Sequence, residues 1–152
     1  MSASTFLGAL VVVLAVIPSG QAFVNPQLRD ILKINVDFKN AVEVNDLDSI
    51  MKLYKPDVLF LPEGHPGFTG KDKLAENLSW VSSAGKYDYY VNYLDYLSWK
   101  DGLVMELKTF TLYDKSENKL FEGKALLLWQ LNKYTGTFEI SLEMFNSNKK
   151  GE

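Results

Sequence analysis

The second half of the chain is a succession of four strand-length segments, and this pattern constrains the fold more than any other feature of the sequence. Each segment is rich in aliphatic, aromatic and β-branched residues, and short turn sequences with glycine or asparagine separate them. Strands joined by such short connections pair as antiparallel neighbours. We therefore expect an antiparallel meander with strands at Tyr87–Leu97, Leu103–Tyr113, Lys119–Leu131 and Thr137–Phe145.

Helical signals dominate the first half of the domain, with one short strand among them. The dipeptide Asn25-Pro26 is typical of a helix start, and helical apolar spacing continues to about Asn45. A second, short helix capped by Asp46 is expected to end before Pro56, because the residue before a proline disfavours helical backbone. The sequence then predicts a buried strand at Val58–Leu61, a loop at Pro62–Gly70, and a helix at Lys71–Ala84 that Gly85 caps. Helices followed by strands predict an α+β fold, with the helices packed on one face of a curved sheet.

The first 22 residues have the composition of a secretory signal peptide. Their apolar run, Phe6–Ile17, is shorter than the roughly 20 residues that a membrane-spanning helix needs. Gly20 and Ala22 provide the small side chains of a cleavage site, and a cut after Ala22 would leave Phe23 as the mature N-terminus. No lysine or arginine lies among Met1–Thr5, so an uncleaved anchor is the alternative. We expect a secreted, extracellular protein with a single domain at residues 23–152.

Composition excludes several classes of function. The 152-residue chain has a formal net charge of −3, so it lacks the excess of positive charge that nucleic acids and anionic membranes attract. It contains no cysteine and one histidine, which excludes disulfides, thiol catalysis and a zinc site with cysteine ligands. Neither a nucleotide-binding motif nor a metal-ligand cluster is present in the sequence. We therefore predict no cofactor and no metal.

Two groups of motifs resemble those of SnoaL-like domains in the nuclear transport factor 2-like superfamily, most closely the branch called domain of unknown function 4440. The first group covers residues 41–76 and comprises Asn45-Asp46, Ile50, Leu53-Tyr54, Asp57 and Gly70-Lys71-Asp72. The second group lies near the C-terminus and comprises Phe121-Glu122-Gly123-Lys124, Trp129, Gly136, Phe138-Glu139-Ile140 and Glu143-Met144-Phe145-Asn146.

This resemblance implies a cone, in which a strongly bent sheet wraps around the long first helix and an apolar pocket opens between sheet and helices. Members of the superfamily include ketosteroid isomerases, polyketide cyclases, dehydratases and epoxide hydrolases, and also proteins without catalysis. The fold alone therefore does not select a function.

Glu143 and His65 are the candidate catalytic residues. The resemblance places Glu143 near the end of the last strand, where many relatives carry a carboxylate facing the cavity, and there burial would raise its pKa. Strict alternation argues otherwise, since it puts Glu143 on the face opposite to Ile140 and Met144 unless a bulge intervenes. His65 lies in a loop that the resemblance places at the pocket mouth, with Glu63 or Glu143 as the group that orients it. The simpler interpretation is a solvated loop histidine.

Four further residues are candidates for ligand contact. The resemblance implies a pocket lined by aromatic and apolar groups, and it places a basic residue after the glycine of the third strand in many relatives. On this basis the predicted contact residues are Tyr54, Trp80, Lys124 and Trp129.

Charged and tyrosine residues on the predicted strands have two interpretations each. Glu106, Lys108, Glu122 and Lys124 form either a pocket floor or, as the sequence favours, a cross-strand charge ladder on a solvated face. Among the tyrosines, alternation puts Tyr87, Tyr89 and Tyr93 on one face and Tyr90 and Tyr96 on the other. A subunit interface is the first interpretation of this aromatic surface and ligand contact the second, so we expect a homodimer.

The sequence therefore supports three functions. The first is binding of a small apolar or amphipathic molecule in the cone. The second is an isomerase, cyclase or dehydratase that uses Glu143 or His65 as a base, without metal or nucleotide. The third is a structural assembly module, which predicts a cavity filled by side chains. In addition, Asn77-Leu78-Ser79 is a glycosylation sequon, although it falls within a predicted helix.

Overall fold

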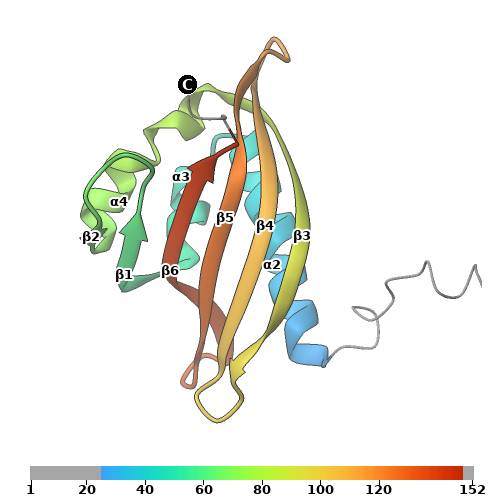
Figure 1. The fold of residues 1–152 in the computed structure, drawn as a ribbon, viewed down its shortest axis with the longest axis vertical. Helices are drawn as coiled ribbons and strands as arrows, with labels where there is room; N and C mark the ends of the chain where they lie inside the picture. Colours follow the sequence, from blue (N-terminus) through green and yellow to red (C-terminus); the bar gives the residue numbers. More distant parts are fainter. Residues whose placement is uncertain (1–24, 149–152) are drawn as a thin grey trace, which may run out of the picture.

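The computed structural model describes residues 25–148 and has an α+β architecture with one six-stranded sheet. The strand order is β2-β1-β6-β5-β4-β3, in which β1 and β6 are parallel and every other neighbouring pair is antiparallel (Figure 1). The predicted signal segment, residues 1–22, lies outside the described residues. In chain order the elements are α2 (Pro26–Glu43), α3 (Leu47–Lys52), β1 (Tyr54–Leu61), β2 (Phe68–Thr69), α4 (Lys71–Asn77), the 3-10 helix η1 (Ser79–Ser83), β3 (Ala84–Ser98), β4 (Leu103–Asp114), β5 (Lys119–Asn132) and β6 (Thr137–Ser147).

The first two helices begin at the predicted caps. The Asn25 side chain accepts a hydrogen bond from the Gln27 backbone N–H at 2.9 Å, and α2 starts at the proline that follows Asn25. The Asp46 carboxylate accepts from the Ser49 backbone N–H at 3.0 Å. Each cap satisfies an N–H group that the helix itself leaves without a partner.

The third predicted helix is shorter than expected. It ends at Asn77, and η1 follows, where the Ser82 and Ser83 hydroxyls donate to the carbonyls three residues earlier. Such bonds favour the tighter 3-10 turn over the α-helix. The predicted cap, Gly85, instead lies inside β3, where a Cβ atom would come within 2.6 Å of the Asp114 carbonyl oxygen. Glycine is therefore needed there for close approach of two backbones.

β1 also differs from its prediction, because it begins at Tyr54 rather than at Val58. Its register with β6 shifts between Tyr54 and Leu59, a stretch that contains Pro56. Proline has no N–H to donate to a ladder, so an irregular pairing at this point accommodates it. The following loop, predicted as irregular throughout, contains the two-residue strand β2.

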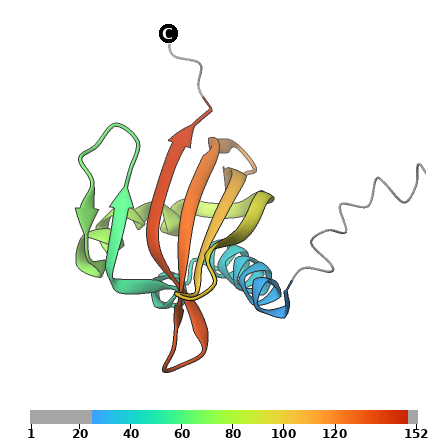
Figure 2. The same cartoon turned by 60° about the horizontal axis from the view of Figure 1, so that its bottom comes forward.

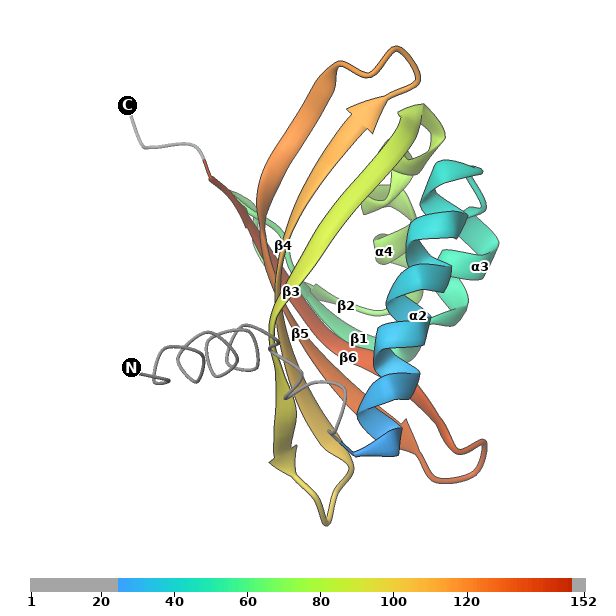
Figure 3. The same ribbon diagram turned by 90° about the vertical axis from the view of Figure 1, so that its right-hand side faces the viewer.

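Within residues 25–148 all helices lie on the same face of the sheet, as predicted (Figure 3). The sheet curves over α2, which lies on the β3 side, while the β1–β2 hairpin forms the opposite edge (Figure 2). The core lies between α2 and the inner sheet face; its members include Leu28, Ile31, Val42, Val104, Leu127, Phe138 and Ile140. Each such side chain contributes about 1.5–3 kcal/mol when it is fully buried. No helix in residues 25–148 combines the length and apolarity needed to cross a membrane.

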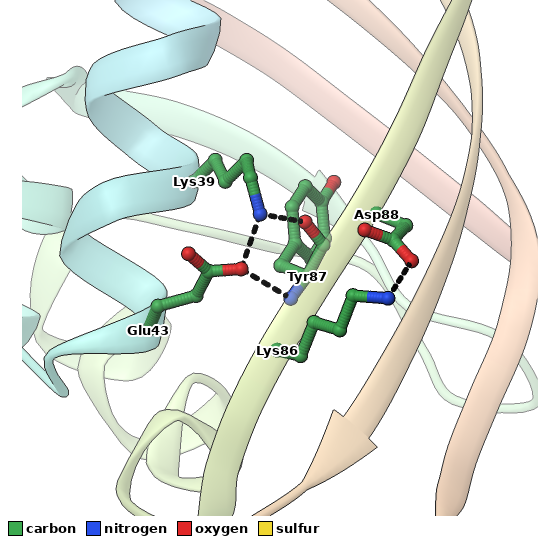
Figure 4. A network of polar contacts seen from close by, with 5 residues as sticks. All are labelled: Lys39, Glu43, Lys86, Tyr87 and Asp88. Atoms are coloured by element: carbon green, nitrogen blue, oxygen red, sulfur yellow. Dashed lines mark hydrogen bonds and ion pairs between the residues drawn. The ribbon is translucent and has the colours of Figure 1, made fainter. Parts of the chain in front are cut away.

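Two side chains of α2 hold the edge strand β3 in place. The Glu43 carboxylate accepts from the Tyr87 backbone N–H at 3.1 Å, and the Lys39 ammonium donates to the Tyr87 carbonyl at 2.9 Å and also pairs with Glu43 (Figure 4). Partial burial raises the pKa of Glu43, but the bonds from Lys39 and Tyr87 outweigh it and lower the pKa overall. These contacts occupy backbone groups that an edge strand otherwise leaves unpaired. They join α2 to β3 beside Phe38 and Tyr87, whose rings are in contact.

Candidate functional site

A cavity of about 410 Å³ opens between the helices and the inner face of the sheet. Its walls come from α2, β1, η1, β3, β4, β5 and β6. Seven of its twelve lining residues are aromatic, and Glu143 is the only charged one. The aromatic lining residues are Phe38, Phe60, Trp80, Tyr87, Phe110, Phe121 and Phe145; the others are Leu78, Ser83, Leu112, Leu120 and Glu143.

The aromatic rings contact one another in a continuous belt. Ring centroids are 5.4 Å apart for Phe38 and Tyr87, 5.6 Å for Tyr87 and Phe110, and 5.4 Å for Phe110 and Phe121. Phe145 then contacts Phe121 at 5.8 Å in an edge-on arrangement. Because these rings hold one another at ordinary aromatic distances, the belt forms a preformed apolar wall with ring faces and edges toward the cavity.

A β-bulge turns Glu143 into this cavity. The register between β5 and β6 pairs Trp129 with Ile140 but Leu128 with Leu142, so Ser141 is an extra residue. The Ser141 hydroxyl donates to the Leu128 carbonyl at 3.0 Å. An extra residue reverses the alternation of side chains beyond it. Glu143 therefore joins Ile140 on the inner face, as the resemblance implied and strict alternation did not.

One oxygen of the Glu143 carboxyl is bound by the protein and the other faces the cavity. The Tyr54 hydroxyl donates to Oε2 at 2.6 Å. No hydrogen bond from the described residues reaches Oε1, and these residues contain no fully buried side-chain oxygen without a partner, so Oε1 is accessible from the cavity. Burial raises the pKa of Glu143, against the lowering effects of Lys108 and the Tyr54 hydrogen bond. Burial and the neighbouring Glu143 carboxyl raise the pKa of Tyr54 well above its ordinary value.

A second polar network lies in the interior. Glu106 is fully buried, and its two oxygens accept from Asn35 Nδ2 at 2.8 Å and from Trp129 Nε1 at 2.7 Å. Lys108, 4% exposed, donates to Asn35 Oδ1 at 3.0 Å, and its ammonium lies 5.1 Å from the centre of the Phe38 ring. Asn35 thus joins a buried anion to a buried cation, and every side-chain atom of the network that needs a partner has one.

The buried network contradicts the predicted charge ladder. Glu106 and Lys108 lie opposite Leu127 and Ala125 on β5, not opposite Glu122 and Lys124. Glu122 and Lys124 are exposed, because they belong to the outer face of the sheet. The four residues therefore divide between the two faces, and the charges of the inner pair are compensated through α2.

The predicted ligand-contact residues have separate locations. Trp80 lines the cavity, whereas Tyr54 lies behind Glu143 and Trp129 is buried against Glu106. Lys124 is exposed beside a shallow outer-face depression that Leu126 and Met144 also line. Of the four, only Trp80 contacts the cavity.

His65 does not join this group. It is exposed in the loop between β1 and β2 and is absent from the cavity lining. Its suggested partner Glu63 accepts instead from the Ser147 backbone N–H at 2.8 Å and from the Ser147 hydroxyl at 2.6 Å. The structure therefore brings Glu143 and His65 to different places.

The distribution of tyrosines differs from strict alternation because β3 also has a bulge. Its register with β4 shifts between Val91 and Tyr93. Tyr93 therefore lies on the outer face with Tyr90, and these two are 42% and 64% exposed. Tyr96 packs against the core, as Tyr87 and Tyr89 do. Only the assignments of Tyr93 and Tyr96 were wrong.

Several lining residues did not stand out in the sequence. Phe38 and Phe110 are apolar positions of a predicted helix and a predicted strand, and Asn35 is a polar residue within the same helix as Phe38. Phe121 belongs to a motif that carries the resemblance, but it was not predicted to line the cavity. Asn35 lies on the buried side of α2, seven residues before Val42 and four after Ile31. That helical spacing was the available signal for a buried polar group.

Solved structures of low sequence identity share this fold, which confirms the resemblance at the level of fold. The ketosteroid isomerase-like protein from Erwinia carotovora atroseptica has a TM-score of 0.67 at 20% identity, over 83% of this chain and 99% of that one. A nuclear transport factor 2-like protein of unknown function from Shewanella oneidensis has 0.65 at 18% identity, over 77% and 96%. A putative scytalone dehydratase from Novosphingobium aromaticivorans has 0.63 at 13% identity, over 80% and 84%. The sequence matches no family model and no curated protein.

Proposed function

We propose that this domain binds a small apolar or amphipathic molecule in the cavity, with Glu143 as its polar anchor. The observation that carries the proposal is a half-buried carboxyl group, held by Tyr54 on one oxygen and open on the other, within an aromatic wall. Binding sites for small molecules commonly combine an apolar concave lining with few polar groups. Apolar contact would provide affinity, and the free oxygen would set the orientation of the ligand.

A pair of serine substitutions tests this proposal. Ser83 lines the cavity and Ser82 does not, although both are exposed and both donate to a carbonyl three residues earlier. A tryptophan at Ser83 should obstruct the cavity, whereas Ser82→Trp is its matched control. We expect Ser83→Trp alone to abolish binding of apolar fluorescent probes, measured by titration of the purified chain. Equal binding by the two variants would contradict the proposal.

The enzyme alternative has support from the same pair of groups. A carboxylate with a raised pKa in an apolar cavity, next to a tyrosine hydroxyl, is suited to moving a proton at a carbon atom beside a carbonyl group. If the domain catalyses an isomerisation, cyclisation or dehydration, Glu143→Gln should abolish turnover. If it only binds its ligand, Glu143→Gln should change the affinity alone. The assembly-module alternative is less favoured, because it calls for a cavity filled by side chains.

We further propose that two copies associate through the outer face of the sheet. Tyr93, Leu107, Leu126 and Met144 are successive cross-strand neighbours on β3, β4, β5 and β6, and they form an apolar row across that face. Leu107 and Tyr93 are 37% and 42% exposed, which is unfavourable for a surface that only contacts water. Sedimentation equilibrium tests this: a dimer that Leu107→Lys dissociates supports the proposal, and a monomeric wild-type chain refutes it.

Secretion remains a proposal that rests on the N-terminal sequence. The protein recovered from the medium of its own source should begin at Phe23, and N-terminal sequencing measures this directly. Asn77 is exposed at the end of α4, so a glycan there would extend into solvent. Removal of N-linked glycans from the secreted protein should then lower its mass, and an unchanged mass would exclude use of the sequon.

A further inference from the structure

The charged groups around the cavity do not balance. Glu106 and Lys108 are connected through Asn35 and compensate each other. Glu143 is the remaining carboxyl group, and within residues 25–148 no cation lies within ion-pair distance of it. Near Tyr87 of the cavity wall, Lys39 pairs with Glu43 and Lys86 pairs with Asp88. When Glu143 is ionised, the interior therefore lacks one positive charge.

The missing positive charge affects binding once a ligand fills the cavity. Filling the cavity displaces water from Oε1, and a carboxylate that loses water without gaining a counter-charge is strongly disfavoured. A neutral ligand can then bind well only if Glu143 takes up a proton or if the ligand donates a hydrogen bond of its own to Oε1. A ligand with its own positive charge restores the balance without proton uptake.

The aromatic rings of the cavity wall also favour a positively charged ligand. A cation is attracted to the faces of aromatic rings within about 6 Å of their centres, and cages of such rings recognise ammonium groups. Lys108 already makes this contact with Phe38 from inside the protein. Phe60, Phe121 and Phe145 line the cavity together with Glu143, with centroid separations of 5.8 Å from Phe145 to each of the other two rings. An ammonium bound to Glu143 would therefore occupy a cavity whose other walls include rings that also favour positive charge.

We propose that the cavity selects a lipophilic cation: a protonated amine on an aromatic or aliphatic body, with the ammonium on Glu143 Oε1 and the body against the aromatic belt. This inference rests on the proposed function, since it names the class of ligand for the same site. The rival ligand is a neutral molecule with a hydrogen-bond acceptor, which a protonated Glu143 would hold by donating its proton.

Matched probes distinguish the two. Phenethylamine and naphthylethylamine carry a proton at neutral pH, as the lysine side chain does, and their alcohol analogues have nearly the same shape without the charge. Isothermal titration calorimetry of the purified chain at neutral pH would give each affinity. Repeating it in two buffers of different ionisation enthalpy would give the protons taken up. We expect the amine to bind at least about tenfold more tightly than its alcohol, ~1.4 kcal/mol, and without proton uptake.

Two variants of one strand assign the effect to Glu143. Glu143→Gln removes the charge in the cavity, and Glu139→Gln makes the same change on β6 outside it, where Glu139 accepts from Asn132. The preference for the amine should disappear in Glu143→Gln and persist in Glu139→Gln. Persistence in Glu143→Gln would overturn the assignment, provided that circular dichroism shows a folded variant.

The wild-type chain gives a test that needs no variant. As the pH falls, Glu143 takes up a proton and the preference for the amine should shrink. The other titratable groups that face Glu143 are Tyr54 on β1, Tyr87 on β3, and Glu106 and Lys108 on β4. Burial raises the pKa of both tyrosines well above the ordinary value, so they stay neutral in this range. A preference that does not change on acidification would contradict the role of Glu143.

Failure of this inference differs from failure of the proposed function. Equal affinities for amine and alcohol, or tighter binding of the alcohol with or without proton uptake, would overturn the cationic ligand and leave a ligand-binding cavity. Binding of none of the four probes would overturn both, because the cavity would then accept neither kind of small amphipathic molecule.

Discussion

Replacing Lys108 with methionine should destabilise the fold substantially, and the buried network explains by how much. Lys108 is 4% exposed and Glu106 is fully buried, so water cannot replace either group's partner. Methionine keeps most of the side-chain volume but leaves Asn35 Oδ1 without its donor and Glu106 without its cation. Breaking a buried ion pair by removing one member costs about 3–5 kcal/mol. Because Asn35 separates the two charges here, we expect about 3 kcal/mol, the lower end of that range.

A double variant tests whether uncompensated charge is the cause. In Lys108→Met with Glu106→Gln no net charge remains. If the Asn35 amide turns over so that its Oδ1 faces position 106, the new amide N–H donates to Asn35 while its oxygen still accepts from Trp129. The double variant should therefore be more stable than Lys108→Met alone. Lys124→Met is the matched control, since Lys124 is exposed on the neighbouring strand and its loss should change stability by less than about 0.5 kcal/mol.

Urea denaturation followed by circular dichroism would measure the free energy of unfolding of wild type, Lys108→Met, Glu106→Gln, the double variant and the Lys124→Met control. We expect a large coupling energy between positions 106 and 108. If the double variant loses the sum of the two single losses, the positions are independent and the charge argument is refuted. A Lys108→Met variant as stable as wild type would refute it too.

Three further perturbations follow from individual contacts. Burial raises the pKa of Glu143 above its unfolded value, so the folded state holds this proton more tightly than the unfolded state does. The stability of wild type relative to Glu143→Gln should therefore decrease as the pH rises above about 4.5, and thermal unfolding across pH would measure this difference. Asn45 has a φ of 60°, and its side-chain amide donates to three backbone carbonyls. Asn45→Ala should therefore lower the free energy of unfolding by about 2–3 kcal/mol in chemical denaturation. A loss below about 0.5 kcal/mol would contradict the role of these bonds. Lys39→Met removes the donor to the Tyr87 carbonyl, which should destabilise the fold by about 1–3 kcal/mol and speed amide hydrogen exchange in β3 near Tyr87. Exchange at the wild-type rate would show that the contact between Lys39 and Tyr87 is unimportant.

The sequence was sufficient for most of the fold because its signals there are local. Caps such as Asn25 and Asp46 act through hydrogen bonds to residues two or three positions away. The four strands of the meander have turn residues between them, and Gly102 and Gly136 adopt the positive φ values that such turns favour. The third helix was predicted less well, because Ser82 and Ser83 offer the backbone an alternative bonding pattern that apolar spacing does not reveal.

The charged interior was not predictable in the same way. Glu106 and Lys108 alternate with apolar residues as an exposed pair does, and such residues are seldom buried without a partner. Their partner Asn35 lies 71 and 73 residues away on α2, so only the packing of helix against sheet brings the three together. Local pattern favours the solvated ladder, and tertiary contact decides against it.

Glu143 illustrates a third situation, in which one inserted residue decides the chemistry of the site. Without the bulge at Ser141, alternation from Ile140 would direct Leu142 and Met144 inward and Glu143 outward. The cavity would then have no charged group, and the Tyr54 hydroxyl would lose its acceptor. No residue type around Ser141 requires a bulge. The bond from the Ser141 hydroxyl to the Leu128 carbonyl forms only once β5 and β6 are paired. The register of the last two strands thus determines both the charge deficit of the cavity and the class of ligand that would correct it.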